Sequence, residues 1–328
     1  MNPLHPDQIK EYQERIPETI EAEPMSRHTT FHIGGPARLY VVAKTSDACI
    51  DAVQAAEVLH IPWYIYGGGS NLLVADKGYE GVVIQLASSG IEATPMGMRV
   101  EAGVITALAA RKAVAEGWAE FAWAVTVPGT IGGAVYGNAG CYGGEMTHVV
   151  SQVEAYDLLT HTRVQLDHMA CGFVYRGSMF KERPHLILSA ELVFASRKTP
   201  EEGKAEIERC LQKRKDTQPS GSSSCGSVFR NVDVHDEGEI EILRRHVDEI
   251  PPSMIVHRRL GAGWLIEQAG MMGERVGGME VSMKHGNFFL NKGHATAEDV
   301  LTLISIVKMK VRDRFGIQLQ EEVQELGF

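Results

Sequence analysis

Two glycine-rich stretches decide the predicted fold: YGGGSNLL at residues 66–73 and VPGTIGGAVYGNAG at residues 127–140. Each is expected to follow a strand and to present several backbone N–H groups with no Cβ in the way, which lets the main chain close on a phosphate. Neither is a P-loop, because no Lys followed by Ser or Thr comes after the glycines, and neither fits the G-x-G-x-x-G fingerprint. As a pair they predict two loops that hold one long ligand with a pyrophosphate group. Either stretch alone is also compatible with an ordinary tight turn.

The composition is that of a globular chain with more than one domain. The chain has 328 residues, of which 44% are hydrophobic and 23% charged, and this length exceeds a comfortable single core. The net charge of −10 and the lack of a long basic run predict that the protein does not bind nucleic acid. No stretch approaches the roughly 18 apolar residues of a membrane span, and the N-terminus has no apolar signal region, so we expect a cytoplasmic protein that does not enter a membrane. The five scattered cysteines contain no C-x-x-C pair, which predicts reduced thiols and no metal site.

Short strands that alternate with helices predict an α+β fold. We expect a lead-in at residues 1–25, a larger region at 26–200 that carries both glycine stretches, and a smaller α+β domain at 201–328. The expected strands lie at residues 38–43, 61–66, 81–86, 98–102, 153–159 and 186–194. The expected helices include one capped by Ser46, one at 106–116, one at 205–215, and one after Thr296, with Asp299 in its capping box and Gly316 at its end.

The segment at residues 233–260 differs from its surroundings in its density of charge. It contains three histidines, His235, His246 and His257, whose spacing matches no metal-ligand set. We therefore expect a solvated insertion here.

Three residues have side chains that suit catalysis. Ser227 lies where a serine-rich loop enters a short apolar segment, but no glycine follows two residues later, which disfavours an esterase elbow. Arg176 stands between an aromatic residue and a glycine, and its guanidinium could pair with a carboxylate or a phosphate. Glu322 belongs to LQEEV at residues 319–323, a predicted strand in which neighbouring carboxylates face opposite sides, so that one points inward. Together these groups suit the addition of a proton beside a substrate carboxylate, but nothing in their spacing brings them together. Two of them also have a common structural reading, Ser227 as a turn former and Arg176 as a solvated arginine.

The ordered set of motifs over residues 27–327 resembles the UDP-N-acetylenolpyruvoylglucosamine reductase family. The motifs that carry the resemblance are TFHIGGPA at 30–37, the two glycine stretches, YR at 175–176, GSVFRN at 226–231, GWLIEQAG at 263–270 and GG at 277–278. The chain lacks the long tyrosine-bearing loop of the larger subtype and so looks like the shorter one.

The resemblance implies a flavoenzyme of peptidoglycan precursor synthesis. It implies a two-lobed FAD-binding region of the p-cresol methylhydroxylase type at residues 26–200, a C-terminal substrate domain, non-covalent FAD and NADPH as co-substrate. Apart from the resemblance, we expect a monomer. NADPH reduces the flavin, which then gives hydride to the enolpyruvyl β-carbon of UDP-N-acetylglucosamine enolpyruvate, and the product is UDP-N-acetylmuramate.

The resemblance also implies residue roles. Ser227 is the acid that protonates the enol, and Arg176 and Glu322 stabilise the developing enolate and its carboxylate, in line with the electrostatic demands of the reaction. The residues implied in FAD binding are Tyr66, Gly67, Gly68, Gly69, Ser70, Asn71, Leu72, Pro128, Gly129, Thr130, Gly132, Gly133 and Asn138. Those implied in substrate binding are Tyr175, Lys215, Arg230 and Asn231.

The chain departs from the family pattern at Gln320 and Glu321, at Val232 where a proline is usual, and in the charged segment 233–260. Two other readings stay open. One is an oxidase of the same flavin superfamily that acts on an alcohol or sugar, which the absence of His or Cys in the first glycine stretch disfavours. The other is a flavin-binding or nucleotide-binding protein without catalysis.

Overall fold

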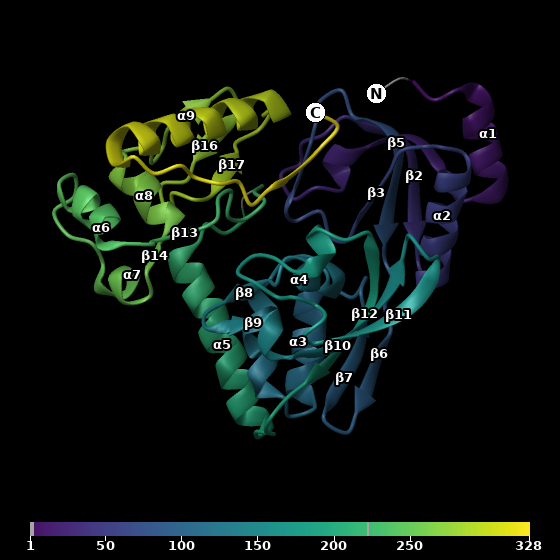
Figure 1. Ribbon diagram of the computed structural model, residues 1–328, viewed down its shortest axis with the longest axis horizontal. Coiled ribbons are helices and arrows are strands. Elements are labelled where there is room, and N and C mark those ends of the chain that lie inside the picture. Colours follow the sequence, from purple (N-terminus) through teal and green to yellow (C-terminus); the bar gives the residue numbers. More distant parts are fainter. Residues whose placement is uncertain (1–2, 222) are drawn as a thin grey trace. The chain divides into compact units, whose positions relative to one another are not determined.

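The chain folds into two compact units, each built from separate stretches of sequence (Figure 1). The computed structural model describes residues 3–221 and 223–328. Unit 1 comprises residues 1–23, 37–68 and 80–216, and unit 2 comprises residues 24–36, 69–79 and 217–328. The first glycine stretch is one of the places where the chain passes from unit 1 to unit 2.

Unit 1 contains two sheets with helices packed on them. Its helices are α1 (Pro6–Arg15), α2 (Ser46–Val58), α3 (Thr106–Ala115), α4 (Ile131–Tyr136) and α5 (Pro200–Thr217). One sheet has the strand order β1 (Ile20–Pro24), β2 (Pro36–Ala43), β5 (Tyr79–Leu86), β3 (Trp63–Tyr66). The other has the order β11 (Thr162–Asp167), β10 (Val150–Asp157), β12 (His185–Val193), β7 (Gly97–Glu101), β6 (Ile91–Thr94). A short hairpin, β8 (Gly140–Cys141) and β9 (Gly144–Glu145), extends from the second glycine stretch.

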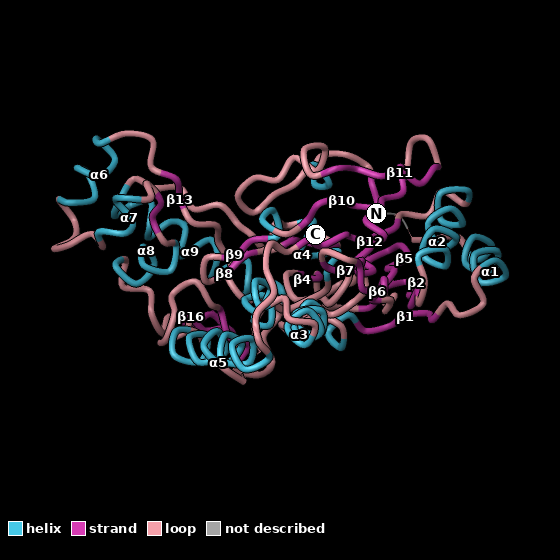
Figure 2. The backbone as a smooth tube through the Cα atoms, turned by 90° about the horizontal axis from the view of Figure 1, so that it is seen from below, coloured by secondary structure: helices cyan, strands magenta, loops and turns pink. Residues whose placement is uncertain are grey.

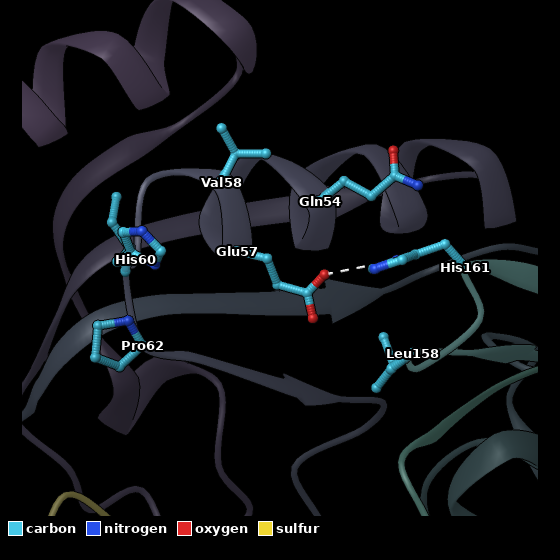
Figure 3. A pocket seen from close by; sticks show the side chains of 8 residues that line it. Gln54, Glu57, Val58, His60, Pro62, Leu158 and His161 are labelled. Atoms are coloured by element: carbon cyan, nitrogen blue, oxygen red, sulfur yellow. Dashed lines mark ion pairs between the residues drawn. The ribbon is translucent and has the colours of Figure 1, made fainter.

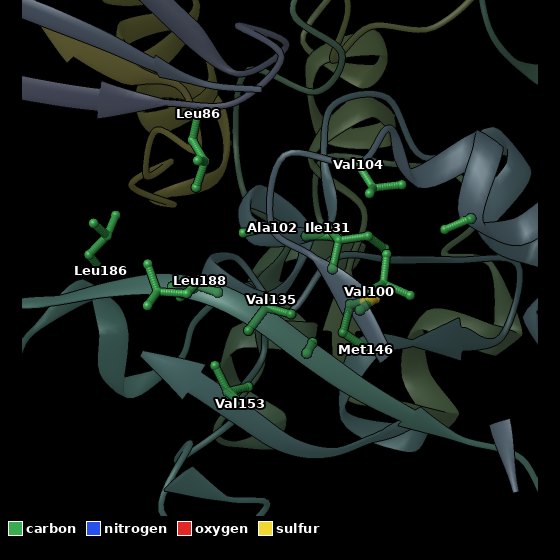
Figure 4. Packing of buried hydrophobic residues seen from close by; sticks show 14 of the residues in the cluster. Leu86, Val100, Ala102, Val104, Ile131, Val135, Met146, Val153, Leu186 and Leu188 are labelled. Atoms are coloured by element: carbon green, nitrogen blue, oxygen red, sulfur yellow. The ribbon is translucent and has the colours of Figure 1, made fainter. Parts of the chain in front are cut away.

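The core of unit 1 lies where the second sheet meets α3 and α4. Four fully buried residues belong to one hydrophobic cluster there: Val100, Ile131, Val135 and Leu188 (Figure 4). Beside the first sheet, α1 and α2 lie next to each other (Figures 1 and 2), and the buried Tyr12 hydroxyl donates a hydrogen bond to the Ala52 carbonyl over 3.1 Å.

Unit 2 is a smaller α+β unit with its own core. Its helices are α6 (Glu237–Arg244), α7 (Pro252–Val256), α8 (Ala262–Gln268) and α9 (Ala297–Phe315). Its strands are β4 (Leu72–Val74), β13 (Val232–Asp233), β14 (Arg259–Leu260), β15 (Arg275–Val276), β16 (Met279–Val281), β17 (Phe289–Asn291) and β18 (Gln324–Leu326). β4 pairs with β18 in parallel, which attaches residues 72–74 to the C-terminal end of the chain.

The predicted start and end of α9 are confirmed. The Thr296 hydroxyl accepts a hydrogen bond from the Asp299 N–H over 3.1 Å, and the Asp299 carboxylate accepts one from the Thr296 N–H over 3.0 Å. Gly316 ends the helix in the left-handed conformation, with φ 71°. For α2 the prediction was off by one residue, since Thr45 caps the helix and Ser46 is its first residue.

The charged segment at residues 233–260 is exposed over most of its length, as predicted, but it is also folded as part of unit 2. It forms α6, α7 and the β13–β14 pair, and its apolar residues Ile240, Leu243, Ile250 and Leu260 are buried in the core of unit 2. The density of charge concealed these apolar positions, which are spaced so that the helices bury one face and expose the other.

The boundaries of the two compact units differ from the continuous domain ranges expected from the sequence, because each unit combines three separate stretches of the chain. Helix α5 packs in unit 1, because its buried residues Ile207 and Cys210 join the core of that unit. Residues 24–36 and 69–79 belong to unit 2. The mixed helices and strands confirm the predicted α+β class.

Candidate active site

The structure brings the two glycine stretches together within unit 1. A Cβ on Gly68 would lie 2.8 Å from the Cα of Gly129, and a Cβ on Gly67 would overlap the Thr130 hydroxyl. Real Cβ atoms do not approach other atoms so closely, so glycine is required at both positions for this contact. The Thr130 side chain in turn accepts a hydrogen bond from the Gly133 N–H over 3.5 Å at the start of α4.

A series of hydrogen bonds between side chains connects the end of β3 to the backbone of the first glycine stretch. The Tyr66 and Tyr40 hydroxyls are 2.8 Å apart, and Tyr40 donates to the Gln85 side-chain oxygen over 2.8 Å. The Gln85 amide then donates to the Gly67 carbonyl over 3.4 Å. Burial raises the pKa of Tyr66 far above its usual range, and its hydrogen bond with Tyr40 adds to the rise. These hydroxyls are therefore neutral structural groups that fix the end of β3.

The second half of the first stretch lies in unit 2, beside Glu322. Gly69 has a left-handed backbone, with φ 60°, and its carbonyl accepts a hydrogen bond from the Thr30 N–H over 3.1 Å. The Asn71 side chain donates to the Glu322 carbonyl over 2.9 Å, and Leu72 pairs with Gln324. The first glycine stretch and the predicted catalytic carboxylate are thus parts of one hydrogen-bonded structure.

The second stretch differs from the prediction that it follows a strand. It comes after a 3-10 segment, Ala119–Thr126, and itself forms α4. The apolar run 119–127 lacks the alternation of a half-buried strand and is buried as compact turns instead. Within the stretch Pro128 and Gly133 are exposed, whereas Gly129 and Gly132 are half-buried, as is Ser70 on the other stretch.

Asn138 ends the second stretch and links it to the turn that carries Arg176. It is 2% exposed and has a left-handed backbone, with φ 41°. Its side-chain oxygen accepts a hydrogen bond from the Thr147 N–H over 2.9 Å, and its amide donates to the Val174 carbonyl over 3.0 Å. These bonds give Asn138 a structural role, and a contact with a cofactor remains a prediction.

Arg176 lies in a tight turn of unit 1. Its guanidinium donates a hydrogen bond to the Gly140 carbonyl over 3.2 Å and lies 5.1 Å from the centre of the Tyr175 ring. Gly140 belongs to the second glycine stretch, so the Arg176 side chain connects the turn to the end of that stretch. Lys215 is exposed on α5 of the same unit.

In unit 2, Ser227 begins a short extended segment that a buried amide holds in place. Ser227 pairs with Phe288, and the Val228 N–H donates to the Asn287 carbonyl over 2.9 Å. The Asn287 side chain accepts from the Phe229 N–H over 2.9 Å and donates to the Phe229 carbonyl over 2.8 Å. With Asn287 only 2% exposed, this pair of bonds fixes the backbone that presents Ser227.

The opposite edge of that segment meets Glu322. The Glu322 N–H donates to the Val228 carbonyl over 2.7 Å, and the Val323 N–H donates to the same carbonyl over 3.4 Å. Two residues facing one is the pattern of a β-bulge, which bends a strand and re-aims its side chains. The sequence predicted a regular strand at 319–323, and that was wrong, since the strand β18 begins only at Gln324.

The neighbouring carboxylates of this segment have different surroundings. Glu321 forms an ion pair with Lys308 over 2.6 Å. Glu322 lies near the buried thiol of Cys225, whose pKa is raised chiefly by burial and further by the charge of Glu322. Glu322 is therefore the carboxylate that shares its surroundings with the segment of Ser227.

Two further predicted residues follow Ser227 in the same segment. The Arg230 N–H donates to the Gln320 carbonyl over 2.9 Å, and its side-chain Nε is buried without a hydrogen bond to any residue that the structure describes. The Asn231 side-chain oxygen accepts a hydrogen bond from the Ala262 N–H over 3.1 Å, at the start of α8.

Sequence reasoning missed Asn287 and Lys181. Asn287 precedes two phenylalanines, and no pattern marks it, because its partner Phe229 is 58 residues away. Lys181 closes the YRGSMFK motif, and the signal available was its position five residues after Arg176.

Elsewhere on unit 1, a separate open pocket of about 840 Å³ lies at the end of α2 (Figure 3). Glu57 and His161 face each other across it, with 4.0 Å between the carboxylate and the imidazole. It shares no residue with the predicted site. Among residues 3–221 and 223–328, no group of three or more His, Cys, Asp or Glu side chains is arranged to hold a metal ion, and no helix has the length and apolar character needed to span a membrane.

Comparison with protein-family models gives a match in each part of the chain. Residues 37–162 match the FAD binding domain family. Residues 218–326 match the C-terminal domain of UDP-N-acetylenolpyruvoylglucosamine reductase. The first match contains both glycine stretches in full, and the second contains Ser227 and Glu322.

Whole-chain comparisons agree with these matches. A UDP-N-acetylenolpyruvoylglucosamine reductase of Caldanaerobacter subterraneus is 36% identical over 308 residues, which cover 93% of this chain and 92% of that protein. The Bacillus subtilis enzyme of the same name is 34% identical and covers 97% of this chain and 98% of its own. The crystal structure of the reductase from Thermus caldophilus matches with a TM-score of 0.72 at 27% identity, covering 94% of this chain and 98% of that one.

Proposed function

The chain belongs to the UDP-N-acetylenolpyruvoylglucosamine reductase family. We propose that Ser227 donates the proton in that reaction and that Arg176 and Glu322 stabilise the enolate. The protein is an FAD-dependent oxidoreductase that reduces UDP-N-acetylglucosamine enolpyruvate, in the synthesis of a peptidoglycan precursor. NADPH is its co-substrate.

The residues present fit a flavin dinucleotide. Where the two glycine stretches meet, Gly68 is exposed and Gly67 and Gly129 are half-buried, and a pyrophosphate can approach glycine backbone of this kind closely. Ser70 and Asn71 offer no nucleophile of the kind that links flavin covalently, so we propose non-covalent binding. When bound, FAD supplies the hydride chemistry, accepting a hydride from NADPH and passing one to the β-carbon of the enolpyruvyl group.

Ser227 is the proposed proton donor to the α-carbon. A neutral hydroxyl can deliver a proton without repelling the anion that forms as hydride arrives at the β-carbon. The bonds from Asn287 and Glu322 to the backbone of residues 228 and 229 support this role, since they hold the Ser227 hydroxyl on a fixed segment. This ordered backbone beside Glu322 is the observation that carries the proposal.

Arg176 and Glu322 are the proposed stabilisers of the enolate and its carboxylate. An enol ether accepts hydride poorly until its carboxylate is polarised, and a fixed guanidinium supplies that polarisation at little reorganisation cost. Glu322 has its place in this proposal because its backbone is hydrogen-bonded to the segment that presents Ser227.

Four further residues are proposed to bind the remainder of the substrate: Tyr175, Lys215, Arg230 and Asn231. Arg230 has the most direct support, because its buried Nε lacks a hydrogen-bond partner in the described part of the chain. We also propose that the enzyme works in the cytoplasm as a monomer, which light scattering of the purified protein would test.

The central experiment separates the two halves of the reaction. Under anaerobic conditions NADPH is added to the flavin-loaded protein, the loss of the yellow absorbance is timed, and UDP-N-acetylglucosamine enolpyruvate is then added. In the wild type the yellow band returns quickly. In Ser227→Ala the bleaching is unchanged and the return slows by about 10²-fold or more, the usual contribution of a general acid.

Ser220→Ala is the matched control, because Ser220 is an exposed serine of the same loop. It should behave as the wild type in both steps. A Ser227→Ala protein with normal return of the band would remove Ser227 from the role of acid, and wild-type protein that oxygen alone re-oxidises would contradict the reductase function.

A further inference from the structure

Arg176 is held in a backbone conformation that arginine rarely adopts. Val174 and Gly177 form a two-way hydrogen-bonded pair, with N···O distances of 3.0 and 3.1 Å, so Tyr175 and Arg176 are the central residues of a tight turn. Arg176 has φ 54° at the third position, where type II turns usually have glycine or asparagine. Such a conformation persists only where the surrounding structure fixes it.

The Lys181 side chain reaches back to that residue. Its ammonium donates a hydrogen bond over 2.8 Å to the carbonyl of Arg176 itself. The same ammonium lies 5.5 Å from the centre of the Tyr136 ring, within the range of a cation–π interaction. Lys181 therefore joins the carbonyl of the strained residue to the last residue of α4.

Other bonds tie the turn to the same part of the second glycine stretch. Ser178 donates to the Tyr136 carbonyl over 2.8 Å, and Asn138 donates to the Val174 carbonyl over 3.0 Å. Arg176 donates to the Gly140 carbonyl over 3.2 Å. Of these contacts, the bond from Lys181 is the one that is made by a charged group to the backbone of Arg176, and charge-assisted bonds are the stronger kind.

We propose that Lys181 is a positioning residue that holds Arg176 in its reactive orientation. The inference rests on the proposed role of Arg176 in stabilising the enolate. The ammonium stabilises the carbonyl orientation that goes with φ 54° and thereby fixes the direction in which the guanidinium leaves the backbone. Lys181 acts through Arg176 and not by its own charge on the substrate.

A double-mutant cycle tests this, with the anaerobic assay described above and flavin-loaded protein. The variants are Lys181→Met, Arg176→Ala, the double variant, and Lys204→Met as a control on an exposed lysine of α5. Lys181→Met should slow the return of the yellow band by about tenfold to a hundredfold, the effect of a small misplacement of a catalytic group, and leave bleaching by NADPH unchanged. In the Arg176→Ala background the same substitution should cost nothing further.

The outcomes separate the inference from the function on which it rests. Normal return of the band in Arg176→Ala would overturn the proposed role of Arg176, whatever Lys181 does. Slow return in Arg176→Ala with normal return in Lys181→Met would overturn the inference alone. The inference would also be overturned if the slowing factors of the two single variants multiplied in the double variant, because the Lys181 charge would then act directly.

Lys181→Gln keeps the measurement decisive if the methionine variant does not fold. Glutamine retains an uncharged donor, so a positioning role predicts a slower return of the yellow band than in the wild type, and no further loss in the Arg176→Ala background. A loss from Lys181→Gln that persists undiminished in that background would contradict the inference.

Discussion

The Arg176 turn and the Ser227 segment present their side chains in different ways. Arg176 has a strained backbone that is fixed by side chains, with the Lys181 ammonium on its own carbonyl and the Asn138 amide on that of Val174. Ser227 begins an extended segment whose backbone is paired on both edges, with Asn287 on one side and Glu322 on the other.

This difference indicates how each site would fail. A segment held by backbone pairing tolerates the loss of the side chain that it presents, since its own hydrogen bonds are unaffected. A turn held by a few long side chains depends on each of them, and its strain is released when one is lost. The following predictions use this contrast, beginning with the largest effect.

Replacing the guanidinium should affect catalysis far more than folding. Arg176→Ala is expected to slow re-oxidation by the substrate by about 10²–10³-fold, the usual cost of removing a group that stabilises an oxyanion. Bleaching by NADPH should be unchanged. Stopped-flow absorbance measures both steps, and Arg183→Ala, on an exposed arginine nearby in the chain, is the control. Equal slowing of both steps would contradict the assigned role.

Removing the buried amide of unit 2 should affect folding far more than the serine does. Asn287→Leu leaves the Phe229 N–H and carbonyl without their partner, which should lower the free energy of unfolding by about 2–6 kcal/mol at about 1–3 kcal/mol for each of the two unsatisfied groups. Urea denaturation measures the loss. Ser227→Ala should change stability by less than about 0.5 kcal/mol, because the hydrogen bonds described for this segment are made by its backbone. Comparable losses in both variants would show that the serine itself holds the segment.

The contact between the glycine stretches should be sensitive to a single methyl group. Gly67→Ala places a Cβ against the Thr130 hydroxyl, and overpacking of this kind costs about 1–3 kcal/mol. We expect weaker FAD binding by at least about fivefold, the lower end of that range, measured by quenching of flavin fluorescence. Adding Thr130→Gly should restore part of the affinity, because it removes the group that the methyl meets. No recovery in the double variant would place the damage elsewhere.

The smallest effect concerns the strain at Arg176. Arg176→Gly and Arg176→Ala both remove the guanidinium, but only alanine keeps a Cβ at φ 54°. The glycine variant should therefore be more stable than the alanine variant by about 1 kcal/mol, the cost of a left-handed L-residue. Thermal unfolding of the two flavin-loaded proteins compares them. A more stable alanine variant would mean that the turn carries no strain.

Much of the local structure follows from the sequence. The capping box at Thr296 and Asp299 and the glycine at 316 define α9 by contacts within a few residues. The strand that leads into the first glycine stretch is likewise marked by its own apolar residues and ends at Tyr66, as predicted. The nature of the reaction was also accessible, because the motifs around Arg176 and Ser227 resemble one family closely.

The tertiary structure decided what depends on residues far apart in the chain. It determined that Gly67 meets Thr130, that Asn287 holds Phe229, and that residues 69–79 belong with the C-terminal unit. It also placed the apolar residues of the charged segment 233–260 in a core, where composition had predicted solvent. The reason is physical: caps and turns are fixed by neighbours within a few residues, whereas the value of a distant contact depends on packing that exists only once the whole unit has folded.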